Sequence, residues 1–118
     1  MNNNTVKIFV YGTLKKGKRL HDFFMKNAEF IKKDEINAKM FNLGSYPAVI
    51  KTRDKEAWIE GEIYKIPNRD FNMINVMESN AGYIAKEIKS KSDEKVLVFY
   101  FKNEDIIKSR NFDKISVF

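Results

Sequence analysis

The tetrapeptide formed by Tyr11, Gly12, Thr13 and Leu14 is the first stretch whose residue types could do chemistry. It ends a run of alternating apolar residues, and the basic sequence KKGKR follows it. A strand that runs into a glycine turn can present successive backbone N–H groups, which bind anions. The alternative is a tight turn followed by solvated charges. These residues alone leave both interpretations open.

Glu78 is the second candidate, because it lies at the end of an amphipathic helix predicted over Arg69–Ser79. A carboxylate is electrostatically unfavourable there, since the helix dipole is negative at its C-terminal end. Residues that break a local rule are candidates for function. Partial burial beside Met77 would raise the pKa of Glu78 and make it a better general base. The alternative is an ordinary exposed glutamate near a helix end.

The remaining polar patterns exclude several kinds of site. The chain has no cysteine, which excludes disulfides, thiolate metal sites and cysteine nucleophiles. His21 is the one histidine and has no HxxH or HExxH partner, so we expect no histidine-based metal site. The glycines form neither a dinucleotide-binding motif nor a P-loop. Glu60 and Glu62 share one face of a predicted strand, where a solvated face is favoured over paired acid–base carboxylates.

Composition and charge narrow the class of protein further. The 118 residues, 43% of them hydrophobic, predict one compact domain over residues 1–118. The formal net charge is +6, but 22 Lys and Arg are scattered among 16 Asp and Glu, so nucleic-acid binding is not expected. The polar start, predicted to be frayed over Met1–Asn4, does not resemble a signal peptide, and no apolar run approaches the roughly 20 residues that cross a bilayer. We therefore expect a cytoplasmic protein with no membrane partner.

Periodicity predicts short strands and helices that could position these candidates. In chain order, the predicted elements are a strand at Thr5–Tyr11, a helix at Leu20–Lys26, extended chain at Phe30–Leu43, strands at Ala48–Lys51 and Trp58–Ile66, a helix at Arg69–Ser79, a hairpin of Tyr83–Ser90 with Lys95–Lys102, and a tail with one short helix and a last strand at Ile115–Phe118. This order predicts an α+β fold with a largely antiparallel or mixed sheet, curled into a small β-barrel with flanking short helices.

Two details concern how these strands pack. Aromatic residues alternate with aliphatic ones in the first strand, so we expect both of its faces to be covered, as in an inner strand. Gly61 lies in the middle of the strand at Trp58–Ile66, which predicts a bulge or a close approach of another part of the chain.

Several short motifs occur in an order that points to a known family. They are YGTL at 11–14, SYPAV at 45–49, EGEIYKI at 60–66 and INVME at 74–78, with Tyr83 soon after. Together they resemble the gamma-glutamylcyclotransferase-like superfamily, in particular its AIG2-like and gamma-glutamylamine cyclotransferase branch. The resemblance covers roughly residues 6 to 101. It implies a small α+β domain built around a curled mixed β-barrel. It also implies a cyclisation that releases 5-oxoproline and an amine or amino acid, without metal or cofactor.

The resemblance also assigns roles to particular residues. It makes Glu78 the general base and the segment from Tyr11 to Leu14 the cradle for a small gamma-glutamyl substrate, with N–H groups that hold the α-carboxylate or the developing oxyanion. Gly12 would let the backbone approach the ligand. Tyr46, Tyr83 and Tyr100 are expected as pocket walls, with core packing as the equal alternative for each. The cations of KKGKR are expected to attract the substrate without contacting it.

The chain departs from the family pattern on both sides of Glu78. The family often has Asp three residues before the glutamate and Gly after it, where this chain has Asn75 and Ser79. A non-catalytic module that binds or sequesters a small molecule in the same pocket is therefore the alternative function. A basic nucleic-acid binder is a weaker one. The identity of the gamma-glutamyl substrate and the oligomeric state stay open.

Overall fold

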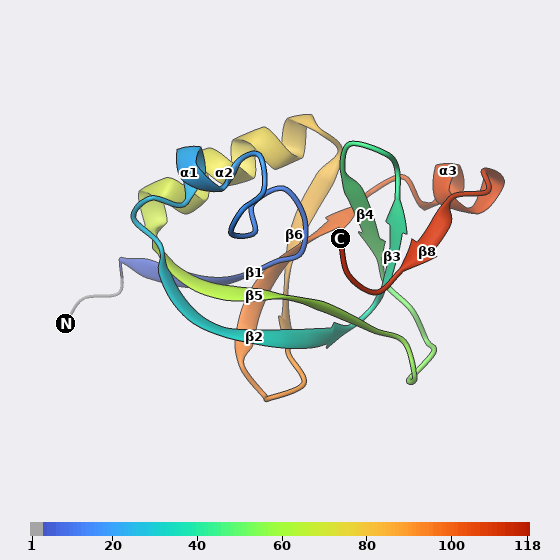
Figure 1. The fold of residues 1–118 in the computed structure, drawn as a ribbon, viewed down its shortest axis with the longest axis horizontal. Coiled ribbons are helices and arrows are strands. Elements are labelled where there is room, and N and C mark those ends of the chain that lie inside the picture. Colours follow the sequence, from blue (N-terminus) through green and yellow to red (C-terminus); the bar gives the residue numbers. More distant parts are fainter. Residues whose placement is uncertain (1–3) are drawn as a thin grey trace.

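The structure is a computed structural model that describes residues 4–118. Most of the end predicted to be frayed, residues 1–3 of Met1–Asn4, therefore lies outside the described residues. Figure 1 shows strongly curved strands with two helices along one side and a smaller group of strands at one end.

The elements follow the predicted order closely. They are β1 (Thr5–Val10), α1 (His21–Phe24), β2 (Glu29–Asn37), β3 (Lys39–Asn42), β4 (Pro47–Ile50), β5 (Trp58–Pro67), α2 (Asn68–Asn80), β6 (Tyr83–Lys89), β7 (Lys95–Phe101), α3 (Glu104–Ser109) and β8 (Asp113–Ile115). The last strand lies earlier than the prediction of Ile115–Phe118. Its residues Asp113–Ile115 pair with β3, which fixes the strand before the chain turns away.

The strands form two sheets in the described part of the chain. The larger has the order β2-β5-β1-β7-β6, and the smaller has the order β4-β3-β8. Strand β1 runs antiparallel to β5 and parallel to β7, so the larger sheet is mixed. The predicted α+β class and mixed sheet are confirmed.

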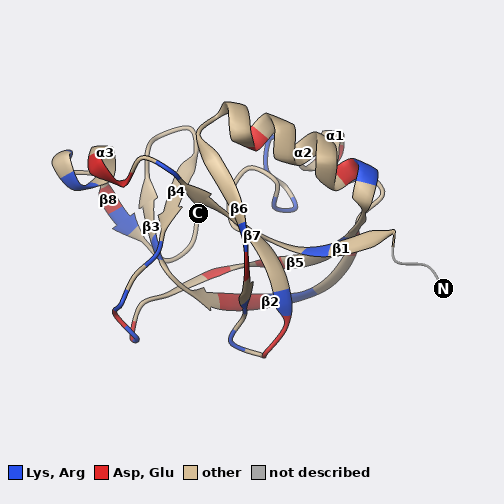
Figure 2. Ribbon diagram, turned by 180° about the vertical axis from the view of Figure 1, so that it is seen from behind, with Lys and Arg blue, Asp and Glu red and all other residues tan. Residues whose placement is uncertain are grey.

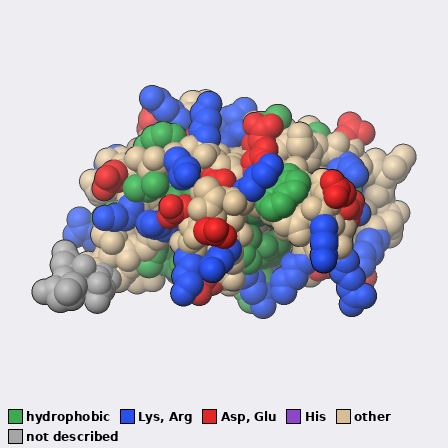
Figure 3. Space-filling model, turned by 90° about the horizontal axis from the view of Figure 1, so that it is seen from below, with side chains coloured by type: hydrophobic (Ala, Val, Ile, Leu, Met, Phe, Trp, Pro, Cys, Tyr) green, Lys and Arg blue, Asp and Glu red, His purple; other side chains and the backbone are tan. Residues whose placement is uncertain are grey.

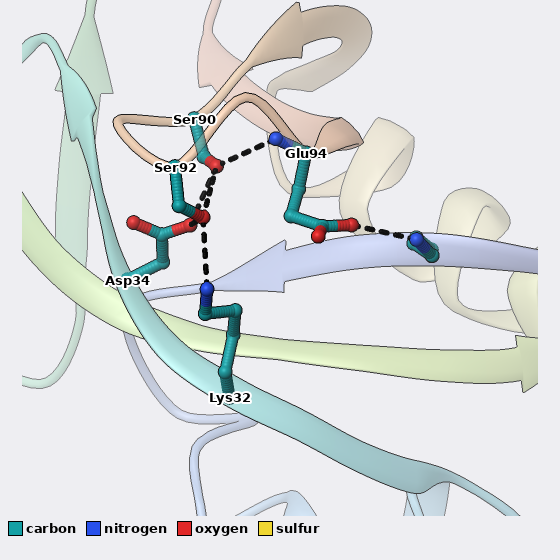
Figure 4. A network of polar contacts seen from close by, with 6 residues as sticks. Lys32, Asp34, Ser90, Ser92 and Glu94 are labelled. Atoms are coloured by element: carbon teal, nitrogen blue, oxygen red, sulfur yellow. Dashed lines mark hydrogen bonds and ion pairs between the residues drawn. The ribbon is translucent and has the colours of Figure 1, made fainter.

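The larger sheet curls but does not close into the predicted barrel. Its edge strands β2 and β6 share no ladder of backbone hydrogen bonds in the described residues. Instead, the turn after β6 reaches β2 through side chains (Figure 4), where Asp34 accepts hydrogen bonds from Ser90 and Ser92. Beside them the Lys91 N–H donates to the Glu35 carbonyl at 2.8 Å. A polar turn offers no extended backbone for strand pairing, so these contacts join the two edges without a ladder between them in the described residues.

Both faces of β1 are buried, as its aromatic and aliphatic alternation predicts. Ile8 and Val10 belong to the apolar cluster beneath α1 and α2, and Phe9 and Tyr11 belong to the cluster on the opposite face of the sheet. Gly61 on β5 makes room for this packing, because a Cβ there would lie 2.5 Å from the Phe9 ring and from the Val10 carbonyl oxygen. The predicted close approach at Gly61 is therefore confirmed.

Basic and acidic residues are not segregated in the two views of charge (Figure 2, Figure 3). Lys and Arg lie on both sheets and on the helices in Figure 2, and acidic and basic side chains are interspersed on the face in Figure 3. Among residues 4–118, no helix has the length and apolar character to cross a membrane.

Candidate functional site

A cavity of about 400 Å³ opens between the end of β1, the end of α2 and the loop before β4. All predicted site residues except Tyr100 line it: Tyr11, Gly12, Thr13, Leu14, Tyr46, Glu78 and Tyr83. These residues come from distant parts of the sequence, so the fold brings the predicted motifs together.

The strand alternation explains why Tyr100 is the exception. Successive residues of β7 point to opposite faces of the sheet. Phe99 belongs to the apolar cluster beneath α2 and lines the cavity, while Tyr100 is buried in the cluster on the opposite face of the sheet and does not line it. Of the two alternatives stated for Tyr100, this position is core packing.

Tyr83, the first residue of β6, connects two parts of the cavity wall by a hydrogen bond. Its hydroxyl donates a hydrogen bond to the Pro47 carbonyl at 2.6 Å, which links β6 to the start of β4. The neighbouring Tyr46 is exposed by 43% and lies at the more open part of the cavity lining. The loop that carries the SYPAV motif is therefore held against the start of β6 by a buried hydrogen bond.

Glu78 is a carboxyl without a partner at the end of α2. Among residues 4–118 it forms neither a hydrogen bond nor an ion pair, and the last turn of α2 contains no basic residue. Burial raises the pKa of Glu78 from an ordinary 4.5 to about 7. A carboxyl with this pKa is present in both protonation states near neutral pH, so it can accept and return a proton.

Tyr83 and Tyr11 lie close enough to Glu78 for its charge to affect their pKa values. Burial is the main cause that raises the pKa of Tyr83 and of Tyr11, and the negative charge of Glu78 raises both further. The Tyr11 hydroxyl donates to the Phe99 carbonyl, so it is already engaged within the protein. Both phenols therefore stay protonated around the carboxylate, and neither is a competing base.

The loop after β1 forms a turn closed by the Lys15 N–H, which donates to the Gly12 carbonyl at 3.0 Å. Within the described residues, the N–H groups of Gly12, Thr13 and Leu14 have no hydrogen-bond partner. They are donors available to a ligand in the cavity that these residues line. Gly12 is needed here for packing as well, because a Cβ would lie 2.8 Å from the Pro47 ring.

Contacts from outside the loop hold it in place. The Lys16 N–H donates to the Glu62 carboxylate at 2.9 Å, and the Leu14 carbonyl accepts from His21 Nδ1 at 2.8 Å. Glu62 also accepts from the Tyr64 hydroxyl, and neither it nor Glu60 lines the cavity. Glu62 of β5 and His21 therefore support the loop from outside the cavity.

Sequence reasoning missed one cation of the site. Arg19 lines the cavity, although the KKGKR run was expected to act only from a distance. It has no hydrogen-bond or ion-pair partner among residues 4–118, so its guanidinium is available to an anion. The sequence feature that could have indicated this position is that Arg19 follows the YGTL motif by only a few residues. In the same part of the chain, no group of three or more metal-ligating side chains comes together.

Comparison with known proteins gives the family from the sequence. Residues 8–114 match the family model described as gamma-glutamyl cyclotransferase, AIG2-like. The chain is 33% identical over 113 residues to protein PH0828 of Pyrococcus horikoshii, which is named provisionally as a gamma-glutamylcyclotransferase, with 94% of each chain covered. It is 27% identical over 84 residues to the gamma-glutamylcyclotransferase family protein YtfP of Escherichia coli, covering 70% of this chain and 71% of that protein.

Solved structures show the same fold. The crystal structure of PH0828 superposes with a TM-score of 0.72 at 27% identity, covering 94% of this chain and 86% of that chain. An AIG2-like protein from mouse superposes with a TM-score of 0.79 at 18% identity, covering 98% of this chain and 89% of that one. The second likeness concerns the fold alone.

Proposed function

We propose, from the premise that this chain belongs to the AIG2-like gamma-glutamyl cyclotransferase family, that it releases 5-oxoproline from a small gamma-glutamyl amine or conjugate. The observation that carries the proposal is Glu78, an unpaired carboxyl whose pKa burial raises to about 7, at the cavity that the YGTL loop lines.

Glu78 acts as the general base in this proposal. Its carboxylate takes a proton from the α-ammonium of the gamma-glutamyl group, and the freed amine attacks the γ-carbonyl carbon. A ring C–N bond forms and the original amide C–N bond breaks. Glu78 returns the proton to the leaving nitrogen. Two of the three ammonium protons end on the released amine, which leaves as an ammonium ion, and the third stays on the ring nitrogen of 5-oxoproline.

The loop after β1 supplies the electrostatic part of the reaction. The free N–H groups of Gly12, Thr13 and Leu14 hold the α-carboxylate or the oxyanion that develops on the γ-carbonyl. Arg19 adds a positive charge at the same cavity. Each of these groups favours a substrate that carries negative charge.

The small number of charged groups suits an intramolecular reaction. Because nucleophile and electrophile belong to the same molecule, a cavity that holds the substrate folded supplies much of the rate through orientation. One base and a few donors are then sufficient, and the proposal needs no metal ion or cofactor.

The test is a mass-spectrometric measurement of 5-oxoproline. Wild type and the isosteric variant Glu78→Gln are incubated with gamma-glutamyl amines, gamma-glutamyl amino acids and glutathione. We expect release by wild type and at least about a hundredfold slower release by the variant. Glu87→Gln removes the same charge from an exposed position on β6 and serves as the matched control. Equal release by wild type and Glu78→Gln would refute the role of Glu78.

The second candidate is a binding module without turnover, which the substitutions Asn75 and Ser79 favour. Neither residue lines the cavity, so the departures from the family pattern leave the described cavity wall intact. The same panel separates the two functions. Tight binding of a gamma-glutamyl compound by folded protein, with no 5-oxoproline formed from any member, would identify the binding module.

A further inference from the structure

The loop that carries the proposed cradle is held by the segment after β8. Lys15 directly follows Leu14 and is only 8% exposed. Its Nζ donates a hydrogen bond to the main-chain oxygen of Phe118 at 2.7 Å, across 103 positions of sequence. Figure 1 shows the segment after β8 returning to the middle of the molecule, close to the loop between β1 and α1.

A buried ammonium group is costly unless it is paired. Burial, followed by the charge of Lys18, lowers the pKa of Lys15, while Glu62 and Glu60 act in the opposite direction. An apolar side chain could fill the same space without this cost. The sequence nevertheless places a lysine here, which joins the loop to one defined acceptor.

Phe118 contacts the loop at a second point. The Lys18 ammonium lies 5.2 Å from the centroid of the Phe118 ring, at a distance typical of a cation–π contact. The ring also packs against the buried cluster that contains Tyr11. One residue before Val117, the Ser116 carbonyl accepts the Glu60 N–H at 2.7 Å, which fixes the segment to β5.

We propose that the segment after β8, residues 116–118, is a positioning element of the cavity, in which Phe118 holds Lys15 and Lys18 so that the loop presents its free N–H groups and Arg19 to the substrate. Lys15 lies beside the turn that contains Gly12, Thr13 and Leu14, so a displaced Lys15 displaces the cradle. Neither Lys15 nor Phe118 lines the cavity. They are positioning residues, and their catalytic effect rests on the function proposed above.

The loop keeps other anchors when this contact is lost. The Lys16 N–H still bonds to Glu62, and the Leu14 carbonyl still bonds to His21. We therefore expect a looser loop in a folded protein. Loosening weakens substrate binding and leaves Glu78 untouched, so it raises KM and leaves the pH midpoint of kcat/KM where it is.

The experiment compares Lys15→Met, which removes the ammonium and keeps an apolar stem, with Phe118→Ala and with a chain that ends at Ser116. Lys15→Arg retains a donor for the Phe118 oxygen, and Val117→Ala changes an exposed neighbour as control. We expect KM to rise about tenfold in Lys15→Met and in the shortened chain, as for a lost charge-assisted hydrogen bond. We expect kcat to change by less than about twofold and Lys15→Arg to stay close to wild type.

Amide hydrogen exchange supplies a second readout that needs no activity. The Lys16 and Leu20 N–H groups, which bond to Glu62 and to the Thr13 carbonyl, should exchange about tenfold faster in Lys15→Met and Phe118→Ala, while amides of β5 keep their protection. Unchanged exchange and unchanged KM in these variants would overturn the positioning role. A wild type that forms no 5-oxoproline but shows the exchange effect would refute the proposed function alone.

Discussion

Replacing Glu78 by Gln should stabilise the protein at pH 8 while it removes 5-oxoproline release. Burial raises the pKa of Glu78 from 4.5 to about 7, so the folded state holds the proton more tightly than the unfolded state does. At 1.36 kcal/mol per pKa unit, this shift corresponds to about 3 kcal/mol of folding free energy.

The direction in which the free energy of unfolding changes with pH depends on whether the folded or the unfolded state binds the proton more tightly. Below pH 4.5 the carboxyl is protonated in both states, and Glu78 imposes no ionisation cost on the fold. Between pH 4.5 and 7 the unfolded state loses its proton first, so the free energy of unfolding falls as pH rises. Above pH 7 the full cost remains, because the carboxylate is ionised in a desolvated position. The neutral amide of the Glu78→Gln variant carries no such cost at any pH.

Urea unfolding of wild type and Glu78→Gln at pH 4 and pH 8 measures the effect. Other titrating groups are common to both proteins and cancel in the difference. We expect the stability difference between variant and wild type to shift by about 3 kcal/mol in favour of the variant from pH 4 to pH 8. Over the same range, kcat/KM of wild type should rise with a midpoint near pH 7. A stability difference that stays constant, or a midpoint near 4.5, would refute the assignment of Glu78 as a desolvated base.

The other predictions concern how the cavity is held and charged. Gly61→Ala should lower the free energy of unfolding by about 1–3 kcal/mol in urea titrations, because the new Cβ overlaps the Phe9 ring. Tyr83→Phe removes the hydrogen bond to Pro47 and should cost about 1–2 kcal/mol of unfolding free energy, with a higher KM in the same preparation. Arg19→Gln should lower kcat/KM for anionic gamma-glutamyl substrates roughly threefold to tenfold at low salt, and the difference from wild type should shrink as salt is raised in the 5-oxoproline assay.

Individual helices and strands could be predicted where the local residue pattern is strong, but the pairing of the strands into sheets could not. The alternation in β1 and the hairpin pattern of β6 and β7 identified all three strands to within one residue at each end. Pairing between distant strands leaves no local pattern, so the parallel contact of β1 with β7 came only from the structure. The sheet was predicted to curl into a small barrel; it does curl, and the turn after β6 meets β2 at Asp34 without a backbone ladder between the two edge strands in the described residues.

The site was predictable as a set of motifs but not in its supporting contacts. Glu78 stood out because a carboxylate breaks the dipole rule at a helix end, and it lies at the cavity. The sequence could not show that Tyr100 lies outside the cavity wall, because it does not show which face of β7 is covered by α2. Lys15 and Arg19 belong to one basic run, yet Lys15 is buried against Phe118 and Arg19 lines the cavity. Composition cannot distinguish two such neighbours.

The features that make Glu78 suitable as a base are the ones that make it unfavourable for stability. A lysine in the last turn of α2 would complement the helix dipole and lower the pKa of the carboxyl. The chain has no basic residue in that turn, and no cation among the described residues pairs with Glu78. The positive charge at the cavity is instead provided by Arg19, on a loop anchored through Lys15, Glu62 and His21 rather than through Glu78. Keeping the cation on a separately anchored loop is consistent with a pKa near neutrality for the proposed base, while the cavity still carries a positive charge for the proposed anionic substrate.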